Sequence, residues 1–256
     1  MSKISITILT IATHWNTKLE NFKRSLHKFG YNYEILAFGE QWKGWKWRTK
    51  KYLDALLKHS NQKNNMNDIF VLIDSYDVLA LRSSDYLLET FYAYETNIVI
   101  GSEWYCGNSK NCFPLKNIWK DFNHVPYRQY LNAGCIIGKT QSLIDMFQWI
   151  LNNNYDDDQY GLAQWIHMNN YDLKNVKLDY GSSIFYNSHV LDGYFNTSAF
   201  FAHFPGPMLK WGLDPIYNFH CKNVLKNNAS LQQPSILIES SIWFILLMCI
   251  VIKFIF

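Results

Sequence analysis

Two aspartates that follow an apolar segment are the residues whose type and spacing most directly suggest chemistry. Asp74 directly follows the apolar residues 70–73, and Asp77 comes three residues after Asp74. Neighbouring carboxylates repel each other, and a divalent cation such as Mg²⁺ or Mn²⁺, which also takes phosphate oxygens, removes the conflict. Tyr76, between them, can present its ring to a base. The pattern predicts a metal–phosphate site, although two turn-forming aspartates that cap a helix would look the same.

The segments around this pair alternate between strand and helix patterns. Strands are predicted over residues 4–12, 33–39, 69–74, 97–102 and 130–140, and helices over 17–29, 83–91, 141–152 and 156–168. A Trp-rich loop within residues 40–59 passes into a further, basic helix. This order predicts an α/β fold with a mostly parallel central sheet. Ligands of such sheets bind beyond the carboxyl ends of the strands, where Asp74 and Asp77 lie.

Composition excludes some classes of function. The net charge of +3 over 256 residues is too small to indicate a nucleic-acid partner. Five cysteines without metal-ligand spacing argue against a zinc site. Cys106 and Cys112 can form a small disulfide loop, and free thiols are an equal alternative.

The C-terminal segment differs from the rest of the chain. Residues 236–256 are almost wholly apolar, and about 20 apolar residues are needed to cross a bilayer. We therefore predict a globular domain over residues 1–225, a polar linker over 226–235 and a single-pass membrane anchor over 236–256. A buried terminal helix or a peripheral hydrophobic tail is the alternative. The first residues show no apolar signal-peptide core, so the domain is expected to face the cytosol by default.

Five motifs in order resemble the glycosyltransferase domain of the procollagen lysyl hydroxylases and related collagen-glycosylating enzymes. They are FVLIDSYDVL, LNAGCIIGKT, NYDDDQYGLAQWI, LDYGSSIFYN and HFPGP, and the resemblance covers residues 4–211. It implies a GT-A type fold, which is a single nucleotide-binding α/β domain. It also implies Mn²⁺ and a UDP-sugar as cofactor and donor.

The resemblance assigns residues to the metal and the nucleotide. Asp74, Asp77 and His203 match the ligands of Mn²⁺, which in turn binds the diphosphate of UDP. Tyr76 matches a tyrosine that stacks on uracil. Four further residues match positions near the nucleotide or its phosphates: Trp42, Lys46, Gly206 and Lys210.

A second group matches positions near the sugar. Asp156, Asp157 and Asp158 form an acidic run, and the last two match positions tied to the donor sugar and to catalysis, where a carboxylate can act as a general base. The alternative is a solvated acidic turn. The other matches are Gln159, Asn132 and Glu103. Gly107 and Asn108 depart from the Trp-Pro that often follows Cys106 in the family.

These assignments predict a Mn²⁺-dependent transferase that moves glucose or galactose from UDP to an acceptor hydroxyl. The expected acceptor is a protein or glycan, such as hydroxylysine or galactosylhydroxylysine of a collagen-like chain. One alternative is a catalytically inactive, membrane-tethered module that binds a UDP-sugar or a glycan. Another is a metal-dependent nuclease or phosphatase, which would leave the LNAGC and DDDQ elements unused.

Overall fold

The protein is represented by a computed structural model that describes residues 5–63, 68–104, 128–169, 172, 174–189, 192, 195–205 and 210–226, without the side chains of 62–63 and 210–213. The elements in chain order are β1 (Ile6–Ile11), α1 (Thr17–Lys28), β2 (Asn32–Leu36), α2 (Trp45–Lys63), β3 (Ile69–Asp74), β4 (Val78–Ala80), the 3-10 turn η1 (Ser84–Tyr86), α3 (Leu87–Tyr92), β5 (Ile98–Glu103), β6 (Tyr130–Lys139), α4 (Thr140–Asn152), α5 (Asp158–Met168), β7 (Val176–Asp179), β8 (Phe185–Asn187), β9 (Phe201–His203) and α6 (Lys210–Lys226).

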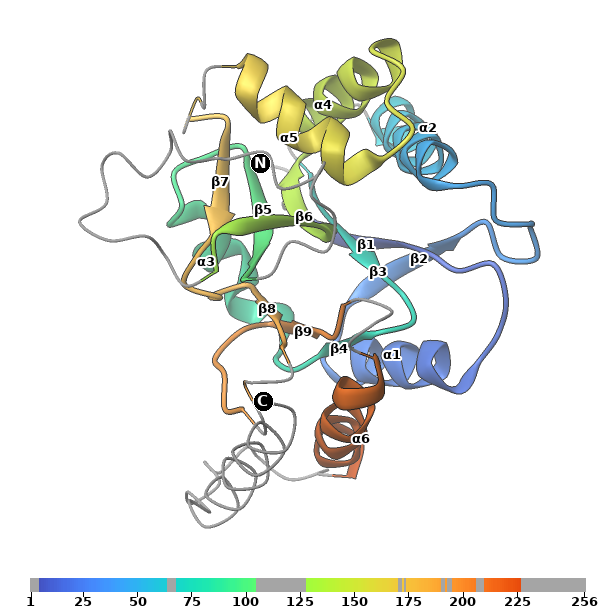
Figure 1. The fold of residues 1–256 in the computed structure, drawn as a ribbon, viewed down its shortest axis with the longest axis vertical. Coiled ribbons are helices and arrows are strands. Elements are labelled where there is room, and N and C mark those ends of the chain that lie inside the picture. Colours follow the sequence, from blue (N-terminus) through green and yellow to red (C-terminus); the bar gives the residue numbers. More distant parts are fainter. Residues whose placement is uncertain are drawn as a thin grey trace, which may run out of the picture.

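A six-stranded central sheet has the order β2-β1-β3-β6-β5-β7 (Figure 1). β6 runs antiparallel to both of its neighbours, and the other three pairings are parallel. The predicted α/β class and mostly parallel sheet are therefore confirmed. The reversed direction of β6 matters for the site, because it brings the start of β6 to the edge where β3 and β5 end.

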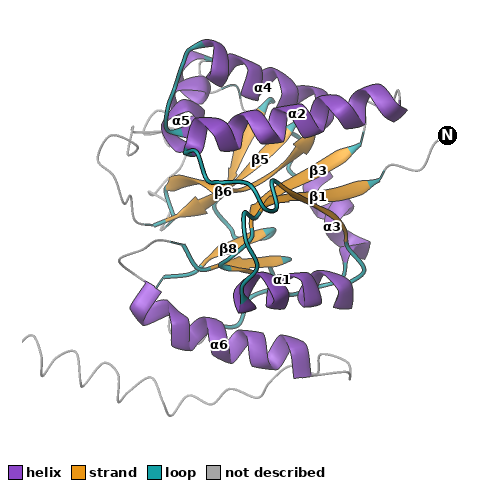
Figure 2. Cartoon of the chain, turned by 90° about the vertical axis from the view of Figure 1, so that its right-hand side faces the viewer, coloured by secondary structure: helices purple, strands orange, loops and turns teal. Residues whose placement is uncertain are grey.

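Helices α2, α4 and α5 cover one face of the sheet, and α1 lies on the opposite side (Figure 2). The residues of β3 from Ile69 to Ile73 are all buried, as expected for a central strand with cover on both faces. Each large aliphatic side chain buried in this way contributes about 1.5–3 kcal/mol. Helix α1 begins at an Asn16 cap, whose side chain accepts a hydrogen bond from the Leu19 backbone N–H over 2.8 Å.

A second sheet of three short strands, in the order β4-β9-β8, lies on the α1 side of the central sheet. Val78 of β4 pairs with His203 of β9, and His203 pairs with Asn187 of β8. Helix α6 packs on this small sheet through a cluster that includes Phe204 and Tyr217. Sequence patterns did not predict these three strands, which are only three residues long each.

Within the described part of the chain, no helix has the length and apolar character needed to cross a membrane. The predicted anchor at 236–256 and the linker beyond Lys226 lie outside the described residues, so the membrane attachment stays a prediction. Cys106 and Cys112 also lie outside them. Cys135 and Cys221, which are described, are buried free thiols.

Candidate functional site

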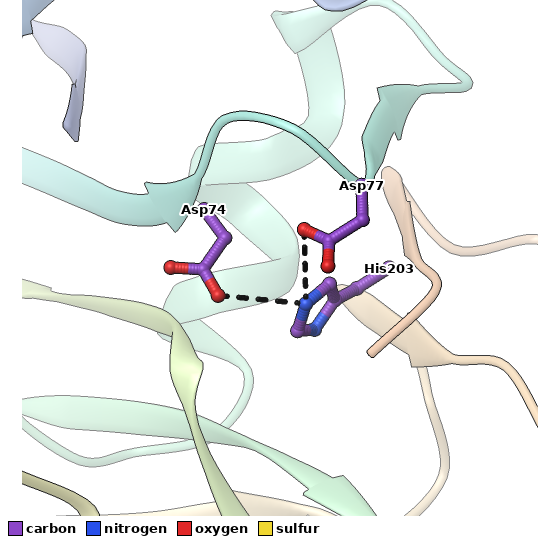
Figure 3. A group of neighbouring side chains, drawn as sticks. All are labelled: Asp74, Asp77 and His203. Carbon is purple, nitrogen blue, oxygen red and sulfur yellow. Dashed lines mark ion pairs between the residues drawn. The ribbon is translucent and has the colours of Figure 1, made fainter. Parts of the chain in front are cut away.

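Three side chains from three strand ends meet beside the central sheet (Figure 3). Asp74 ends β3, Asp77 precedes β4 and His203 ends β9. His203 Nε2 lies 3.6 Å from Asp74 Oδ2 and 3.5 Å from Asp77 Oδ1. One ligand atom from each residue lies within 4.8 Å of the others. The predicted trio is therefore assembled in space, in a geometry that can hold one metal ion.

Asn187 determines which nitrogen of His203 faces the aspartates. The Asn187 Nδ2 donates a hydrogen bond to the carbonyl of Ser102 over 2.9 Å, which leaves its Oδ1 as the acceptor for His203 Nδ1 at 2.7 Å. His203 therefore carries a hydrogen on Nδ1 and presents Nε2 to the carboxylates. A ligating histidine is commonly oriented in this way by a partner on its other nitrogen.

His203 is buried, and its pKa reflects its neighbours. Burial lowers the pKa of the imidazole, but Cys135 and Asp77 raise it, and the net result is a pKa well above the usual range. The two carboxylates beside Nε2 thus favour the protonated imidazole. A metal ion bound there would take the place of a proton on Nε2, so that binding and deprotonation would be linked.

Gly134 leaves the space that the side chains of Asp74 and His203 occupy. A Cβ at this position would lie 2.5 Å from Asp74 Oδ2 and 2.8 Å from His203 Cε1. Real Cβ atoms do not approach so closely, so any other residue would displace these ligands. The close approach of the β6 backbone, together with the carboxylate and imidazole ligands, fits a divalent cation such as Mn²⁺.

A buried arginine pairs with the cluster. Arg48 of α2 donates from Nη1 to Asp74 Oδ1 over 2.5 Å and from Nε to Asp158 Oδ2 over 2.6 Å. Its Nη2 donates to the carbonyl of Ala133 over 3.1 Å. Burial lowers the pKa of Arg48, but the carboxylates of Asp158 and Asp74 raise it by a larger amount. The net pKa is above the usual value for arginine, so the guanidinium stays charged.

The three acids of the run at 156–158 have three different environments. Asp156 is exposed, whereas Asp157 caps α5 by accepting from the Tyr160 backbone N–H over 2.9 Å. Asp158 is buried against Arg48, and burial raises its pKa to about 6 in spite of that partner. Arg48 forms ion pairs with both Asp158 and Asp74. One member of the acidic run is therefore connected through Arg48 to the group formed by Asp74, Asp77 and His203.

The residues predicted near the sugar lie together where β5 ends and β6 begins. Asn132 Nδ2 donates to Glu103 Oε2 over 3.0 Å, and Gln159 Oε1 accepts from the Ala133 backbone N–H over 3.1 Å. Burial raises the pKa of Glu103, and the hydrogen bond from Asn132 lowers it by a smaller amount, so that the net pKa is about 7. A carboxyl that titrates near neutral pH can donate or accept a proton toward a ligand hydroxyl.

Tyr76, in the turn between Asp74 and Asp77, contacts the loop after β1. Its hydroxyl accepts hydrogen bonds from the backbone N–H groups of Thr13 and His14, over 2.9 and 3.0 Å. Its ring stacks on His14 with centroids 5.0 Å apart. The turn between Asp74 and Asp77 is thereby joined to the loop after β1.

Four other residues were predicted near the nucleotide or its phosphates: Trp42, Lys46, Gly206 and Lys210. Trp42 is 42% exposed and packs edge-to-face on Trp45 and Trp47. Lys46 hydrogen-bonds to Asn154 in the turn before α5. Gly206 lies outside the described residues, and Lys210 is the first residue of α6, with its side chain not described.

Three residues of the site were not predicted from sequence: Arg48, Gly134 and Asn187. The LNAGC motif contains Gly134 and the SSIFYN motif contains Asn187, so both lay inside segments that had been singled out. Arg48 is the one arginine among several lysines of a basic helix, and it is buried.

A model of a known protein family matches most of the chain. The family model described as "PLOD GT domain" matches residues 2–198. The chain therefore belongs to this family of glycosyltransferase-type domains, as the sequence motifs indicated.

The individual relatives to which the chain is similar are longer proteins. The chain is 24% identical over 193 residues to procollagen-lysine,2-oxoglutarate 5-dioxygenase of Drosophila melanogaster, covering 72% of this chain and 26% of the relative. It is 25% identical over 199 residues to procollagen-lysine,2-oxoglutarate 5-dioxygenase 1 of Mus musculus, covering 74% and 26%. It is 23% identical over 191 residues to the human multifunctional procollagen lysine hydroxylase and glycosyltransferase LH3, covering 71% and 25%. The match spans about a quarter of the length of each of these curated relatives.

Among solved structures, the chain is similar to a glycosyltransferase involved in the glycosylation of the major capsid of PBCV-1. The TM-score is 0.49 at 10% identity, covering 86% of this chain and 98% of that chain.

Proposed function

We propose that this domain transfers a hexose, glucose or galactose, from a UDP-sugar to an acceptor hydroxyl, with Mn²⁺ bound by Asp74, Asp77 and His203. The observation that carries the proposal is the convergence of these three ligand atoms beside Gly134. When bound, the cation would supply the positive charge that stabilises a departing diphosphate.

The other residues have roles that follow from their places. Tyr76 stands at the turn between the two aspartates, where its ring would support the base of the nucleotide. Glu103 and Asn132 would hydrogen-bond the hydroxyls of the sugar. Asp157 and Asp158 would act on the sugar or take the acceptor proton. The ion pairs of Arg48 with Asp158 and with Asp74, which connect the start of α5 to the end of β3, support these roles.

The acceptor is proposed from the relatives. Their names include procollagen lysine as the group modified and, for LH3, glycosyltransferase activity. We therefore expect hydroxylysine or galactosylhydroxylysine in a collagen-like chain to be an acceptor. This part of the proposal is independent of the metal site.

A donor screen tests the proposal. The full chain is incubated with Mn²⁺ and UDP-glucose, UDP-galactose, UDP-GlcNAc or UDP-xylose, with and without a hydroxylysine peptide, and released UDP is measured. One UDP-hexose should be turned over, and Asp77→Asn should abolish the release. Lys50→Met, which changes an exposed residue of α2, is the matched control. Binding of UDP without turnover of any donor would indicate a nucleotide-sugar binding module instead of an enzyme.

A further inference from the structure

We propose that Arg48 is a positioning residue of the metal centre, which holds Asp74 with one oxygen turned toward the cation and joins it to helix α5. The inference rests on the proposed function, because it takes the Asp74–Asp77–His203 cluster to be a cation site. It concerns a side chain that is not itself a metal ligand.

The contacts of Arg48 fix its position from three directions. Its nitrogens donate to the Asp74 carboxylate at the end of β3, to the Asp158 carboxylate at the start of α5 and to the Ala133 carbonyl in β6. The side chain is only 5% exposed. A guanidinium is a rigid planar group, so three acceptors on three elements leave it a single orientation.

The two oxygens of Asp74 have different partners as a result. Oδ1 accepts from Arg48, while Oδ2 faces His203 Nε2 and lies where a Cβ at position 134 would clash with it. Arg48 therefore restrains the rotation of the Asp74 carboxylate, so that it offers one oxygen to a cation. A carboxylate without this restraint would have to be ordered when the cation binds, and that ordering would weaken binding.

The indole of Trp45 covers Arg48, with the guanidinium carbon 4.9 Å from the ring centroid. A cation that lies over an aromatic face is stabilised when it is removed from water. Trp45 itself is 47% exposed, so this contact lies at the surface of the protein. A lysine at position 48 would keep the charge but could not reach all three acceptors.

Charge and position predict opposite effects of replacing Arg48. The arginine is a positive charge beside a cation site, so Coulomb repulsion alone predicts that Arg48→Met binds Mn²⁺ more tightly. Positioning predicts the reverse, because loss of a group that orients a ligand commonly weakens metal binding by about 10- to 100-fold. For Arg48→Lys, charge alone predicts no change, whereas positioning predicts weaker binding.

The test is a Mn²⁺ titration without nucleotide, followed by loss of the paramagnetic resonance signal of free Mn²⁺. It is run on the wild-type chain, Arg48→Lys, Arg48→Met, Asp74→Ala and the control Lys50→Met. We expect both Arg48 variants to bind Mn²⁺ at least about 10-fold more weakly, and Lys50→Met to bind it as the wild type does. Donor turnover by the Arg48 variants should recover as Mn²⁺ is raised, which a general folding defect would not allow.

The inference would be overturned if either Arg48 variant bound Mn²⁺ as tightly as the wild type or more tightly, while Asp74→Ala did not bind it. That result would leave the proposed function intact. Absence of donor turnover by the wild type would overturn the proposed function, while the titration would still decide the role of Arg48. If Arg48→Met does not fold, Arg48→Lys decides. The rise in melting temperature on adding Mn²⁺ gives a second measure for any folded variant, and it should be smaller than for the wild type.

Discussion

Asn187 and His203 lie opposite each other on the parallel strands β8 and β9, and Asn187 Oδ1 accepts from His203 Nδ1 over 2.7 Å. This bond presents Nε2 to the aspartates. Asn187→Leu should weaken Mn²⁺ binding by about 10-fold or more, because the imidazole loses its orienting partner. Isothermal calorimetry measures the effect.

Asn187→Asp is the informative control, since it keeps an acceptor for His203 but cannot donate to the carbonyl of Ser102. It should bind Mn²⁺ better than the leucine variant. Equal affinities of Asn187→Leu and the wild type would contradict the orientation argument.

Gly134→Ala should disrupt the metal centre, because its methyl group would meet Asp74 Oδ2 at 2.5 Å. We expect Mn²⁺ binding to fall by about 10-fold or more, as for the loss of ligand orientation. Gly138→Ala is the matched control on the same strand, where the added Cβ would meet Asn97 O at 3.0 Å, away from the cluster. Both variants should lose stability in thermal unfolding, but only Gly134→Ala should lose the metal. A Gly134→Ala protein with intact metal binding would contradict this account.

Glu103 should make the stability of the domain depend on pH. Its pKa rises from 4.5 to about 7 on folding, chiefly through burial, so the folded state binds a proton that the unfolded state has released. The contribution of Glu103 to the free energy of unfolding should therefore be fully present below pH 4.5 and should be lost between pH 4.5 and 7. Urea unfolding at pH 4.5 and pH 7 measures the difference, and Glu103→Gln should reduce it. An unchanged pH dependence in Glu103→Gln would show that other groups cause the effect.

Asp179 should be a structural residue, although it lies in one of the family motifs. Its buried carboxylate accepts from the backbone N–H groups of Ser183, Ile184 and Phe185 over 2.7–2.8 Å, and from the Tyr94 hydroxyl. Asp179→Asn replaces one acceptor oxygen with a donor. It should lower the free energy of unfolding by about 3 kcal/mol, the upper value for a hydrogen bond to a charged group.

Tyr94→Phe, which removes a single donor from Asp179, should cost only about 1.5 kcal/mol in the same denaturation experiment, the lower value for a hydrogen bond to a charged group. A larger loss in Tyr94→Phe than in Asp179→Asn would contradict this role for the carboxylate.

Much of the fold was predictable because its strands and helices have strong local patterns. The strand over residues 69–74 has its predicted bounds, since a continuous apolar run ends at a charged residue there. The direction of β6 was not predictable, because it depends on pairing with β3 and β5 and not on its own residues. The short strands β4, β8 and β9 carry too few residues for a periodic pattern.

The candidate site divides in the same way. Asp74 and Asp77 were predicted from their position after an apolar strand, whereas His203 was assigned only through the family motif. Arg48 was not singled out because its neighbours Lys46, Lys50 and Lys51 also carry positive charges, and the sequence does not show which of them is buried in the folded chain. The three roles within residues 156–158 likewise follow from the helix start and from Arg48, not from the run of identical side chains.

The ligands of the cluster belong to two different sheets: Asp74 to the central one, and Asp77 and His203 to the ends of adjacent strands in the small one. An ion held by all three would act as a cross-link between separate layers of the domain. Amide protons of β4 and β9 should then exchange with solvent more slowly once the ion is present, while those of the distant edge strand β2 should not change. Loading with metal would thus alter the rigidity of the fold as well as its chemistry.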